Sequence, residues 1–517
     1  MILFLIPALL LVAAFAVKAI YHLYLSPLAR QGIPGPWYAA VSDLWSTTQQ
    51  LSLRQFRGVD ALLKKYGPVV RIGKNKVVFL DVQALKTVYG VTAKFDKSDF
   101  YQRFLTNHNQ HSFTFIDAKD HANRKRSYAG HYSVTNLARY APKIERVLLQ
   151  MVDGLLKNGG KSTFDVMSLY RHLLVDNIFN VAFDTDVGIM ERWTRNEFSP
   201  LDQAVTDFPK AQTMIELFPR PLTFLLFSIP HARLQSFLRS DVILCEAATG
   251  IFKKALAEFE SSKAIESSDD EKADSENAGR EVDGKSLIRR MLEFKMPDTG
   301  RRMTDLEIIS EAQSHLIAGS ETTSTTMSYA TFELSRRPDV VFRLRQEIDS
   351  AIPDLRTMGD LTMLQNLPYL NAVIKEVLRL YPAIPGPLLR SVPAHVPDFT
   401  IAGYHIPPGT TLATQCTTLH RQKEVWGEDA DEFRPERWFE ETEAMRTNFI
   451  PYGLGARMCS GWNLANVMLR VLLSTLTRNF DIIAAPETTQ SSLYVLESFA
   501  SFPLALQAKF RFLPRTE

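Results

Sequence analysis

The stretch Tyr452-Gly453-Leu454-Gly455-Ala456-Arg457-Met458-Cys459-Ser460-Gly461 places one cysteine in a glycine-rich loop, with an arginine two positions before it. Glycine adopts positive φ easily and lets the backbone pass close to a flat ligand. Backbone N–H groups that point at the sulfur would stabilise a thiolate, the form of cysteine that binds a metal. This pattern predicts that Cys459 offers a thiolate to a haem iron. The alternative for a single cysteine is a buried, inert side chain.

The composition of the 517-residue chain is that of a packed globular protein, with 45% hydrophobic and 22% charged residues. The formal net charge of +2 provides no sequence-wide attraction to nucleic acid, and no nucleic-acid motif is present. The three cysteines, Cys245, Cys416 and Cys459, are far apart and form no CxxC pair. This spacing favours a reducing compartment over a disulfide framework and argues against a zinc site.

The N-terminal segment is apolar from Met1 to Val17 and, after Lys18, continues to Leu25, which is long enough to cross a bilayer. A cleaved signal peptide is the alternative, because 14–16 reads Ala-Phe-Ala, like a cleavage site. However, no basic residue precedes the apolar run, and the positive charges Lys18 and Arg30 come after Val17. This charge pattern favours a retained anchor with the body of the protein in the cytosol.

We therefore predict three parts in the chain. Residues 1–25 form a transmembrane anchor, residues 26–50 form a stiff proline-rich hinge, and residues 51–517 form a catalytic body. The hinge includes Ile33-Pro34-Gly35-Pro36.

Helical periodicity dominates the body, with predicted helices at 53–66, 136–156, 303–336, 340–351, 370–380 and 463–478. β-rich runs at 68–73 and 77–80 predict a hairpin, and a second β-rich patch spans 399–412. The expected fold class is mainly α with a small β portion, preceded by one transmembrane helix.

Two segments of the body are unusual in composition. Residues 261–285 are rich in Ser, Glu, Asp, Lys and Ala without an apolar stripe, which predicts a solvated, disordered loop. Residues 218–229 are apolar but too short to span a membrane. This segment is either buried core or a loop that dips into the bilayer near a substrate entrance.

A polar sequence, Ala318-Gly319-Ser320-Glu321-Thr322-Thr323, interrupts the middle of the longest predicted helix. Glycine and clustered Ser and Thr are poor helix formers and favour a kink. A helix opened at this point would leave room for a small molecule such as dioxygen. The alternative is a polar face that packs on a neighbouring helix.

Two further patterns carry charge on predicted helices. Glu376 and Arg379 are three residues apart on one face and can pair, although many surface helices carry such pairs. His121 and Lys125 share a face at i, i+4 in the run His-Ala-Asn-Arg-Lys-Arg that ends at Arg126. A surface histidine is the alternative for His121, and a solvated loop charge is the alternative for Arg390.

The cysteine loop resembles the haem-binding signature of the cytochrome P450 family, Phe-x-x-Gly-x-Arg-x-Cys-x-Gly, with Tyr452 at the aromatic position. The other motifs follow in the family's order, so the resemblance covers essentially the whole chain. It implies that Cys459 binds the iron of haem b and that Gly453, Gly455, Arg457 and Gly461 shape the cofactor-binding loop.

The resemblance also implies roles for the remaining motifs. Thr322 and Glu321 would relay protons to dioxygen. Glu376, Arg379 and Arg437, the last from Phe433-Arg434-Pro435-Glu436-Arg437-Trp438, would form a buried network that holds the cysteine loop.

The haem propionates would be bound by His121, Lys125, Arg124 and Arg390. Lys125 stands where the family usually has arginine, and it lacks the bidentate fork, so Arg124 or Arg126 could contribute more. An aromatic-rich segment between Asp96 and Ile116 falls where the family has a substrate-contacting loop; its aromatic residues are Phe100, Tyr101, Phe104, Phe113 and Phe115.

The function that the resemblance implies is monooxygenation of a hydrophobic small molecule. Electrons would come from NADPH through a separate flavoprotein reductase, either alone or together with a cytochrome b-type donor. The protein would be a single-pass endoplasmic reticulum protein whose catalytic domain faces the cytosol. The anchor and hinge look most like those of fungal members, many of which act in secondary-metabolite biosynthesis.

Two other functions remain open from the sequence. A haem-thiolate isomerase or dehydratase would use the same cysteine without dioxygen, and the presence of Thr322 beside an acid argues against it. A non-catalytic membrane haem protein would keep the cysteine loop but would not turn over substrate.

Overall fold

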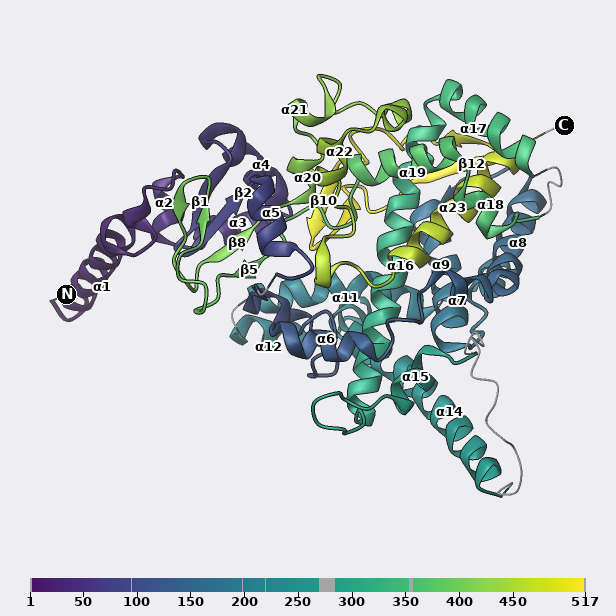
Figure 1. Cartoon of the computed structure of the whole chain (residues 1–517), viewed down its shortest axis with the longest axis horizontal. Helices are drawn as coiled ribbons and strands as arrows, with labels where there is room; N and C mark the ends of the chain where they lie inside the picture. The colour runs from purple at the N-terminus through teal and green to yellow at the C-terminus, as the bar shows by residue number, and fades with distance from the viewer. Residues whose placement is uncertain are drawn as a thin grey trace.

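The computed structural model describes residues 2–93, 95–197, 199–218, 220–268, 284–352 and 357–515. Most of the body is helical, and short strands form a small β portion, which confirms the predicted fold class (Figure 1). Helix α1 (Ile2–Ile20) projects from the body at the N-terminal end (Figure 1). The long helix α16 (Asp305–Ser335) runs through the middle of the helical part (Figure 1).

The remaining α-helices are α2 (Trp37–Val41), α3 (Leu44–Leu51), α4 (Gln55–Tyr66), α5 (Val82–Tyr89), α6 (Ala118–Arg126), α7 (Val134–Ala138), α8 (Ala141–Asn158), α9 (Val166–Phe183), α10 (Ile189–Thr194), α11 (Pro200–Leu217), α12 (Arg220–Ser228), α13 (Ala232–Leu238), α14 (Ser240–Ser268), α15 (Leu287–Glu293), α17 (Pro338–Ala351), α18 (Leu361–Gln365), α19 (Pro368–Leu380), α20 (Cys416–Leu419), α21 (Lys423–Trp426), α22 (Glu443–Asn448) and α23 (Trp462–Asn479). For five of the six predicted helices, both ends lie within two residues of the ends of a helix in the structure. The predicted helix 136–156 is two helices, α7 and α8, because Pro142 is tolerated only in the first turn of a helix and so starts a new one.

The largest sheet has the strand order β1-β2-β8-β5-β3. It consists of β1 (Val69–Gly73), β2 (Lys76–Phe79), β8 (Thr411–Ala413), β5 (Arg390–Ser391) and β3 (Asp96–Lys97). β1 and β2 form the predicted antiparallel hairpin, and β8 joins β2 in parallel. At the other edge Lys97 lies directly opposite Arg390 in the antiparallel pair β3–β5. The sheet therefore brings two basic residues nearly 300 positions apart side by side.

The other strands form three small sheets. β4 (Phe164–Asp165), β12 (Lys509–Pro514) and β9 (Phe480–Ala484) make one sheet, β10 (Val495–Ser498) pairs with β11 (Ala500–Pro503), and β6 (Thr400–Ile401) pairs with β7 (Tyr404–His405). The predicted β-rich patch 399–412 thus contains β6, β7 and most of β8.

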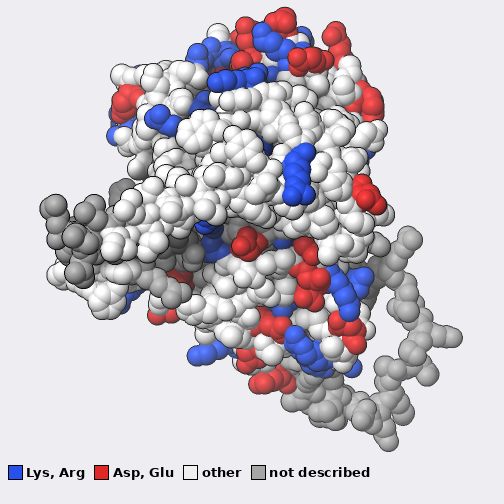
Figure 2. All heavy atoms as spheres, turned by 90° about the vertical axis from the view of Figure 1, so that its left-hand side faces the viewer, with Lys and Arg blue, Asp and Glu red and all other residues white. Residues whose placement is uncertain are grey.

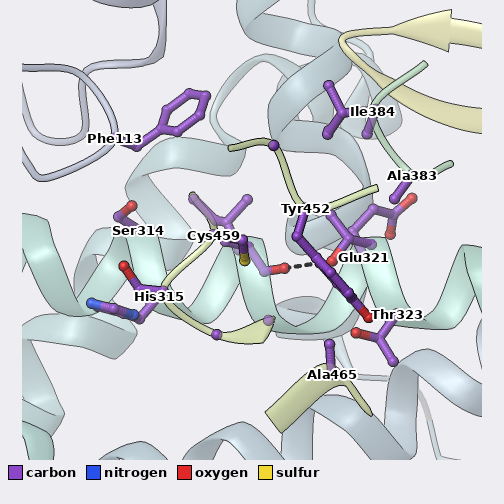
Figure 3. Close-up of a pocket in the computed structure, with 18 of the residues that line it drawn as sticks. Phe113, Ser314, His315, Glu321, Thr323, Ala383, Ile384, Tyr452, Cys459 and Ala465 are labelled. Atoms are coloured by element: carbon purple, nitrogen blue, oxygen red, sulfur yellow. Dashed lines mark hydrogen bonds between the residues drawn. The ribbon is translucent and has the colours of Figure 1, made fainter. Parts of the chain in front are cut away.

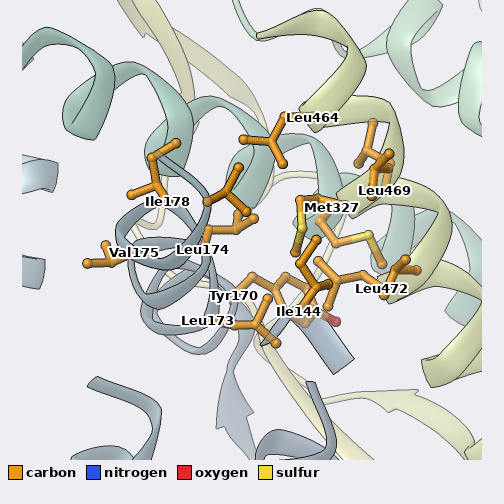
Figure 4. Packing of buried hydrophobic residues seen from close by; sticks show 14 of the residues in the cluster. Ile144, Tyr170, Leu173, Leu174, Val175, Ile178, Met327, Leu464, Leu469 and Leu472 are labelled. Atoms are coloured by element: carbon orange, nitrogen blue, oxygen red, sulfur yellow. The ribbon is translucent and has the colours of Figure 1, made fainter. Parts of the chain in front are cut away.

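The main core lies where α16 packs against α9 and α23. Apolar side chains from these helices interdigitate, among them Tyr170, Leu173, Leu174 and Ile178 of α9, Met327 of α16, and Leu464, Leu469 and Leu472 of α23 (Figure 4). Full burial of one such leucine contributes about 1.5–3 kcal/mol relative to exposure. This packing holds α16 rigidly where it borders the cavity described below.

The predicted opening of α16 at this point is wrong, because the α-helix is continuous from Asp305 to Ser335. The hydroxyls of Ser320 and Thr322 donate to the carbonyls of Leu316 and Ala318, at 2.7 and 2.9 Å, and so bond within the helix. Gly319 instead serves helix packing: a Cβ there would lie 2.6 Å from Cδ1 of Ile178 on α9. The glycine allows close approach of two helices.

Three other segments differ from the prediction or extend it. Residues 261–268 are helical, as the end of α14, so the predicted disordered loop does not begin at 261; residues 269–283 lie outside the described part. The apolar segment 218–229 is not buried core, because Phe224 on α12 is 75% exposed. Residues 26–50 carry α2 and α3, and buried Leu28 and Ile33 pack on the largest sheet, so this segment belongs to the folded body.

Candidate active site

A cavity of about 350 Å³ lies between α16 and the loop that precedes α23. Further parts of its wall come from α6, α9 and α11, from the segment between Lys97 and Phe113, and from residues near β5 and the β10–β11 turn. Cys459 faces the middle of α16, between His315 on one side and Glu321 on the other (Figure 3). The cavity therefore combines the two sequence motifs that were predicted to carry chemistry.

Glycines shape the cysteine loop. Gly453 and Gly455 have φ of +74° and +66°, a backbone region that favours glycine. A Cβ at Gly455 would lie 2.0 Å from the carbonyl oxygen of Tyr89, so a side chain does not fit there. Gly453 and Gly461 border the cavity, and a Cβ at either would meet open space. The loop thus leaves a flat, unobstructed floor around the cysteine.

The sulfur of Cys459 is accessible because it faces the cavity. Burial raises the pKa of the Cys459 thiol, while the Gly461 N–H and the Lys125 ammonium lower it. A backbone bond from the N–H of Cys459 to the carbonyl of Tyr452, at 2.9 Å, fixes the loop. A cation bound at the sulfur would stabilise the thiolate, so the site is suited to binding a metal ion through Cys459.

One end of the cavity is lined by the basic side chains Lys97, Arg390 and Arg457, together with His121. Burial and the charges of these cations and of Lys125 lower the pKa of His121 to about 2, so it is neutral. Burial and the neighbouring Arg390 also lower the pKa of Arg457 to about 10. No ion pair within the described residues includes Lys97, Arg390 or Arg457. Such a cluster fits a ligand with more than one carboxylate.

Lys97 was missed by the sequence analysis. It is 5% exposed, and burial followed by the charges of Arg390 and Arg457 lowers its pKa well below the usual value. Its Nζ donates to the carbonyl of Phe113 at 2.5 Å. β3 has only two residues, so no periodic pattern marks Lys97; only its pairing with Arg390 identifies it.

Two predicted propionate ligands on α6 point elsewhere. Arg124 is 2% exposed and lies outside the cavity, where it pairs with Glu307 at 2.7 Å and Glu311 at 3.5 Å on α16. Arg126 bonds to the side chain of Asn123 at 3.4 Å and does not line the cavity either. Arg124 therefore joins two helices, because the turn from His121 to Arg124 carries its side chain away from the cavity face.

Lys125 lies under the cysteine loop and not in the cavity wall. Its Nζ donates to the backbone carbonyls of Ala456 and Met458, at 3.2 and 3.0 Å. Arg457 shows a related arrangement, because its guanidinium donates to the carbonyls of Phe115 and Ile116 at 2.6 and 2.5 Å. These contacts hold the loop against α6 and the segment before it.

Thr322 and Glu321 border the cavity on α16 and have different surroundings. The Thr322 hydroxyl donates to Ala318 within the helix. Glu321 is 5% exposed, and its Oε2 accepts from Nε of Arg171 on α9 at 2.9 Å. Arg171 also lies 3.6 Å from Asp202 on α11. Glu321 thus belongs to a buried ion-pair cluster between three helices, which the sequence analysis did not detect.

We expect the Arg171→Met variant to lower the free energy of unfolding by about 3 kcal/mol, because it leaves two buried carboxylates, Glu321 and Asp202, without their cation. Urea unfolding followed by circular dichroism measures the loss. Arg195→Met is the matched control, because its partner Glu191 is exposed and such surface pairs contribute about 1 kcal/mol or less. Equal losses in the two variants would contradict the importance of the buried cluster.

Glu376, Arg379 and Arg437 lie together in a buried network next to the cysteine loop. Arg379 donates to both carboxylate oxygens of Glu376 at 2.9 and 2.8 Å, and Arg437 donates to Oε1 at 2.9 Å. Trp438 adds a bond from its indole N–H to Oε2 at 3.0 Å. All lone pairs of the carboxylate face donors, which is the condition under which a buried ion pair is stable.

His420 connects this network to the start of the cysteine loop. Arg379 donates to the carbonyl of His420 at 2.8 Å, and His420 Nε2 accepts from the backbone N–H of Ile450 at 2.9 Å. Burial lowers the pKa of His420 to about 3, so the ring is neutral and can accept this bond. A lone histidine gave no sequence signal, and only the fold shows its role.

Aromatic side chains form another part of the cavity wall. Tyr101, Phe104 and Phe113 from the predicted substrate-contacting segment line the cavity, whereas Phe100 and Phe115 do not. Phe499 from the β10–β11 turn packs against Phe104 and Phe113, with ring centroids 4.9 and 5.4 Å apart. The sequence analysis did not identify Phe499. This wall suits an apolar ligand.

Comparisons with known proteins agree with this geometry. A family model described as "Cytochrome P450" matches residues 34–510. The chain is 28% identical over 505 residues to the cytochrome P450 monooxygenase cypX of Dothistroma septosporum, covering 95% of this chain and 93% of the relative. It is 28% identical over 512 residues to the benzoate 4-monooxygenase bphA of Aspergillus niger, covering 95% of each. A cytochrome P450 monooxygenase of Aspergillus parasiticus, aflV, is 29% identical over 501 residues, with 95% and 92% covered.

Proposed function

Because the chain belongs to the cytochrome P450 family, we propose that it is a haem-thiolate monooxygenase that inserts one oxygen atom from O2 into a hydrophobic small molecule. One observation carries the proposal: a single accessible cysteine sulfur faces α16 across a cavity with a basic end. When bound, haem would supply dioxygen activation, with the thiolate donating electron density to the iron.

The residues present fit this cofactor. Cys459 would bind the iron, and the loop around Gly453, Gly455 and Gly461 leaves space for a flat ring. Lys97, His121, Arg390 and Arg457 would hold the two propionates, because they form the basic end of the cavity. Lys125 would act indirectly, by fixing the loop carbonyls. Arg124 is not proposed as a ligand.

Thr322 and Glu321 would take part in proton transfer. The Thr322 hydroxyl borders the cavity and can donate to a ligand there when it releases the Ala318 carbonyl. Arg171 fixes the orientation of the Glu321 carboxylate, so proton transfer requires either water in the cavity or a change of this contact. Glu376, Arg379 and Arg437 would have a structural role.

We expect Thr322→Ala to release more hydrogen peroxide per NADPH and to form about a hundredfold less product, the usual scale for losing a positioned proton donor. Peroxide and product are measured together with a reductase and a substrate found by screening aromatic small molecules. Thr325→Ala is the control, because that hydroxyl is buried and outside the cavity wall. Unchanged product without extra peroxide would refute the proton role and favour an isomerase or dehydratase.

Several features support attachment to a membrane. Among the described residues one segment, Val12–Gln31, is long and apolar enough to span a bilayer, and 11% of it is buried. The face that carries α1 shows a broad area with few charged residues (Figure 2). Exposed apolar side chains on and after α12 extend the possible contact area; they are Leu222, Phe224, Leu225, Phe227 and Ile229. An apolar surface of this kind suits a bilayer.

On this basis residues 1–25 would anchor the protein in the endoplasmic reticulum membrane, with the catalytic body in the cytosol. Electrons would come from NADPH through a flavoprotein reductase, with a cytochrome b-type protein as a further donor. Relatives named as fungal monooxygenases support a role in fungal secondary metabolism, and the benzoate 4-monooxygenase supports an aromatic substrate.

The absorption spectrum of the solubilised protein, reduced and exposed to carbon monoxide, tests the central proposal. A strongly red-shifted Soret band is expected from a thiolate-bound haem. Folded protein that binds no haem, or that gives a histidine-type spectrum, would refute it.

A further inference from the structure

A small side pocket of about 30 Å³ adjoins the main cavity, and Phe499 and Ile384 line both. One water molecule needs about 10–15 Å³, so the side pocket holds a group of one or two heavy atoms. Its wall includes several polar residues, namely Gln50, Gln55, Arg103, Thr213, Glu497 and Ser498. The proposed oxygenation assigns no role to this pocket.

Glu497 on β10 is the buried polar group of the side pocket. It is 5% exposed, and its Oε1 accepts from the backbone N–H of Phe56 at 3.1 Å. Its Oε2 is also buried but has no hydrogen-bond partner within the described part of the chain. A buried oxygen without a partner is costly, so a water or ligand atom is expected beside it.

A glycine makes room for this carboxyl group. Gly386 lies against it, and a Cβ at that position would come within 2.8 Å of Oε2. Burial raises the pKa of Glu497 to about 8, although the nearby charge of Arg57 lowers it. At neutral pH the carboxyl is therefore mostly protonated and can both donate and accept a hydrogen bond.

Phe499 separates the side pocket from the main cavity. It is the single residue between the paired ends of β10 and β11, and its φ is +86°. Positive φ is rare and strained for a bulky aromatic residue, and it persists where the surroundings or a function require it. The turn presents the ring to both pockets, so a ligand in the main cavity reaches Glu497 past Phe499 and Ile384, which line both.

The charges around the side pocket restrict what it can bind. Arg103 in its wall and Arg57 nearby disfavour an ammonium group. An ionised carboxylate or phosphate presents acceptor oxygens to Oε2, which has no donor within the described part of the chain, and this disfavours both groups. A neutral group that accepts and donates hydrogen bonds remains, and a hydroxyl matches the available volume.

We propose that the side pocket receives a hydroxyl group at the far end of the substrate and that Glu497 selects for it. The inference rests on the proposed function and specifies its substrate class: an apolar molecule that carries a free hydroxyl away from the carbon to be oxidised. A hydrogen-bonding group at this position fixes which end of the molecule approaches the cysteine side of the cavity.

Pairs of 1-alkylimidazoles test this inference. Their free ring nitrogen binds haem iron and shifts its absorption, so the dissociation constant is measured without turnover. Each pair has the same chain length and ends in either a methyl or a hydroxyl group, and the chain is lengthened step by step. At the length that reaches the side pocket, the affinity ratio of hydroxyl to methyl probe should rise about fivefold, as expected for one net hydrogen bond.

Glu497→Met should abolish this rise, and Glu497→Gln should retain it. Because the ratio is formed within one variant, differences in haem content cancel. Glu443→Met, at an exposed position on α22, is the control and should behave as wild type. If Glu497→Met yields no haem-loaded protein, Gly386→Ala replaces it; its Cβ crowds Oε2 and should reduce the rise.

The outcomes separate the two proposals. If no probe shifts the spectrum of folded protein, the haem site itself is wrong. If the probes bind but the wild type shows no preference for the hydroxyl at any length, or the preference survives Glu497→Met, the side-pocket inference is overturned.

Discussion

Replacing Cys459 by serine is expected to abolish the red-shifted Soret band of the reduced, carbon monoxide-treated protein. Serine has nearly the same shape but is not ionised at neutral pH, so it supplies no thiolate to the iron. We expect product formation to fall more than about a hundredfold. Loss of a group that only supports a metal ligand lowers activity by up to about a hundredfold, and loss of the ligand itself should have a larger effect. The spectrum and the product yield are measured on the same purified sample.

The matched control is Cys245→Ser. Cys245 is half-buried on α14 and outside the cavity wall, and its replacement should leave both the spectrum and the yield unchanged. If Cys459→Ser keeps the wild-type spectrum, the assignment of the iron ligand is wrong. Loss of the band in both variants would instead point to a general sensitivity of the fold to these substitutions.

The second large effect is expected at Glu376. Glu376→Gln preserves the shape of the side chain but removes the charge that balances Arg379 and Arg437, which are 0% and 3% exposed. Stranding buried charges in this way costs about 3–5 kcal/mol. We expect a matching drop in the free energy of unfolding, measured by urea titration, and loss of haem during purification.

Glu443→Gln serves as the control for this prediction. Glu443 is 79% exposed and pairs with Arg446 on the surface, so its loss should change stability by about 1 kcal/mol or less. A Glu376→Gln variant as stable as this control would show that the network does not support the cysteine loop.

Local patterns predicted much of the fold. Helices with a strong 3.6-residue period, such as α17, α19 and α23, were found with nearly correct ends, because one face of each is buried. The prediction was wrong at Gly319, where low helix propensity was interpreted as an opening of the helix. The glycine is explained by contact with Ile178 on another helix, and intrinsic propensity contains no information about such a contact.

The candidate site was predicted where its residues belong to compact motifs, as at Cys459 and Thr322. Lys97, Arg171 and Phe499 were missed because each acts through partners distant in sequence: Arg390, Glu321 and Phe104. Arg124 was assigned to the cofactor from its position in a basic run, although only the helix geometry decides which way each side chain of that run points.

The direct pairing of Lys97 with Arg390 has a consequence for how the protein matures. Like charges opposite each other in an antiparallel pair destabilise that pair. A dianionic cofactor bound between them would turn this repulsion into attraction, and binding to the folded state alone raises its stability. Closure of the β3–β5 edge and capture of haem would then be coupled steps, so a cell short of haem would accumulate chains whose sheet edge is incompletely formed.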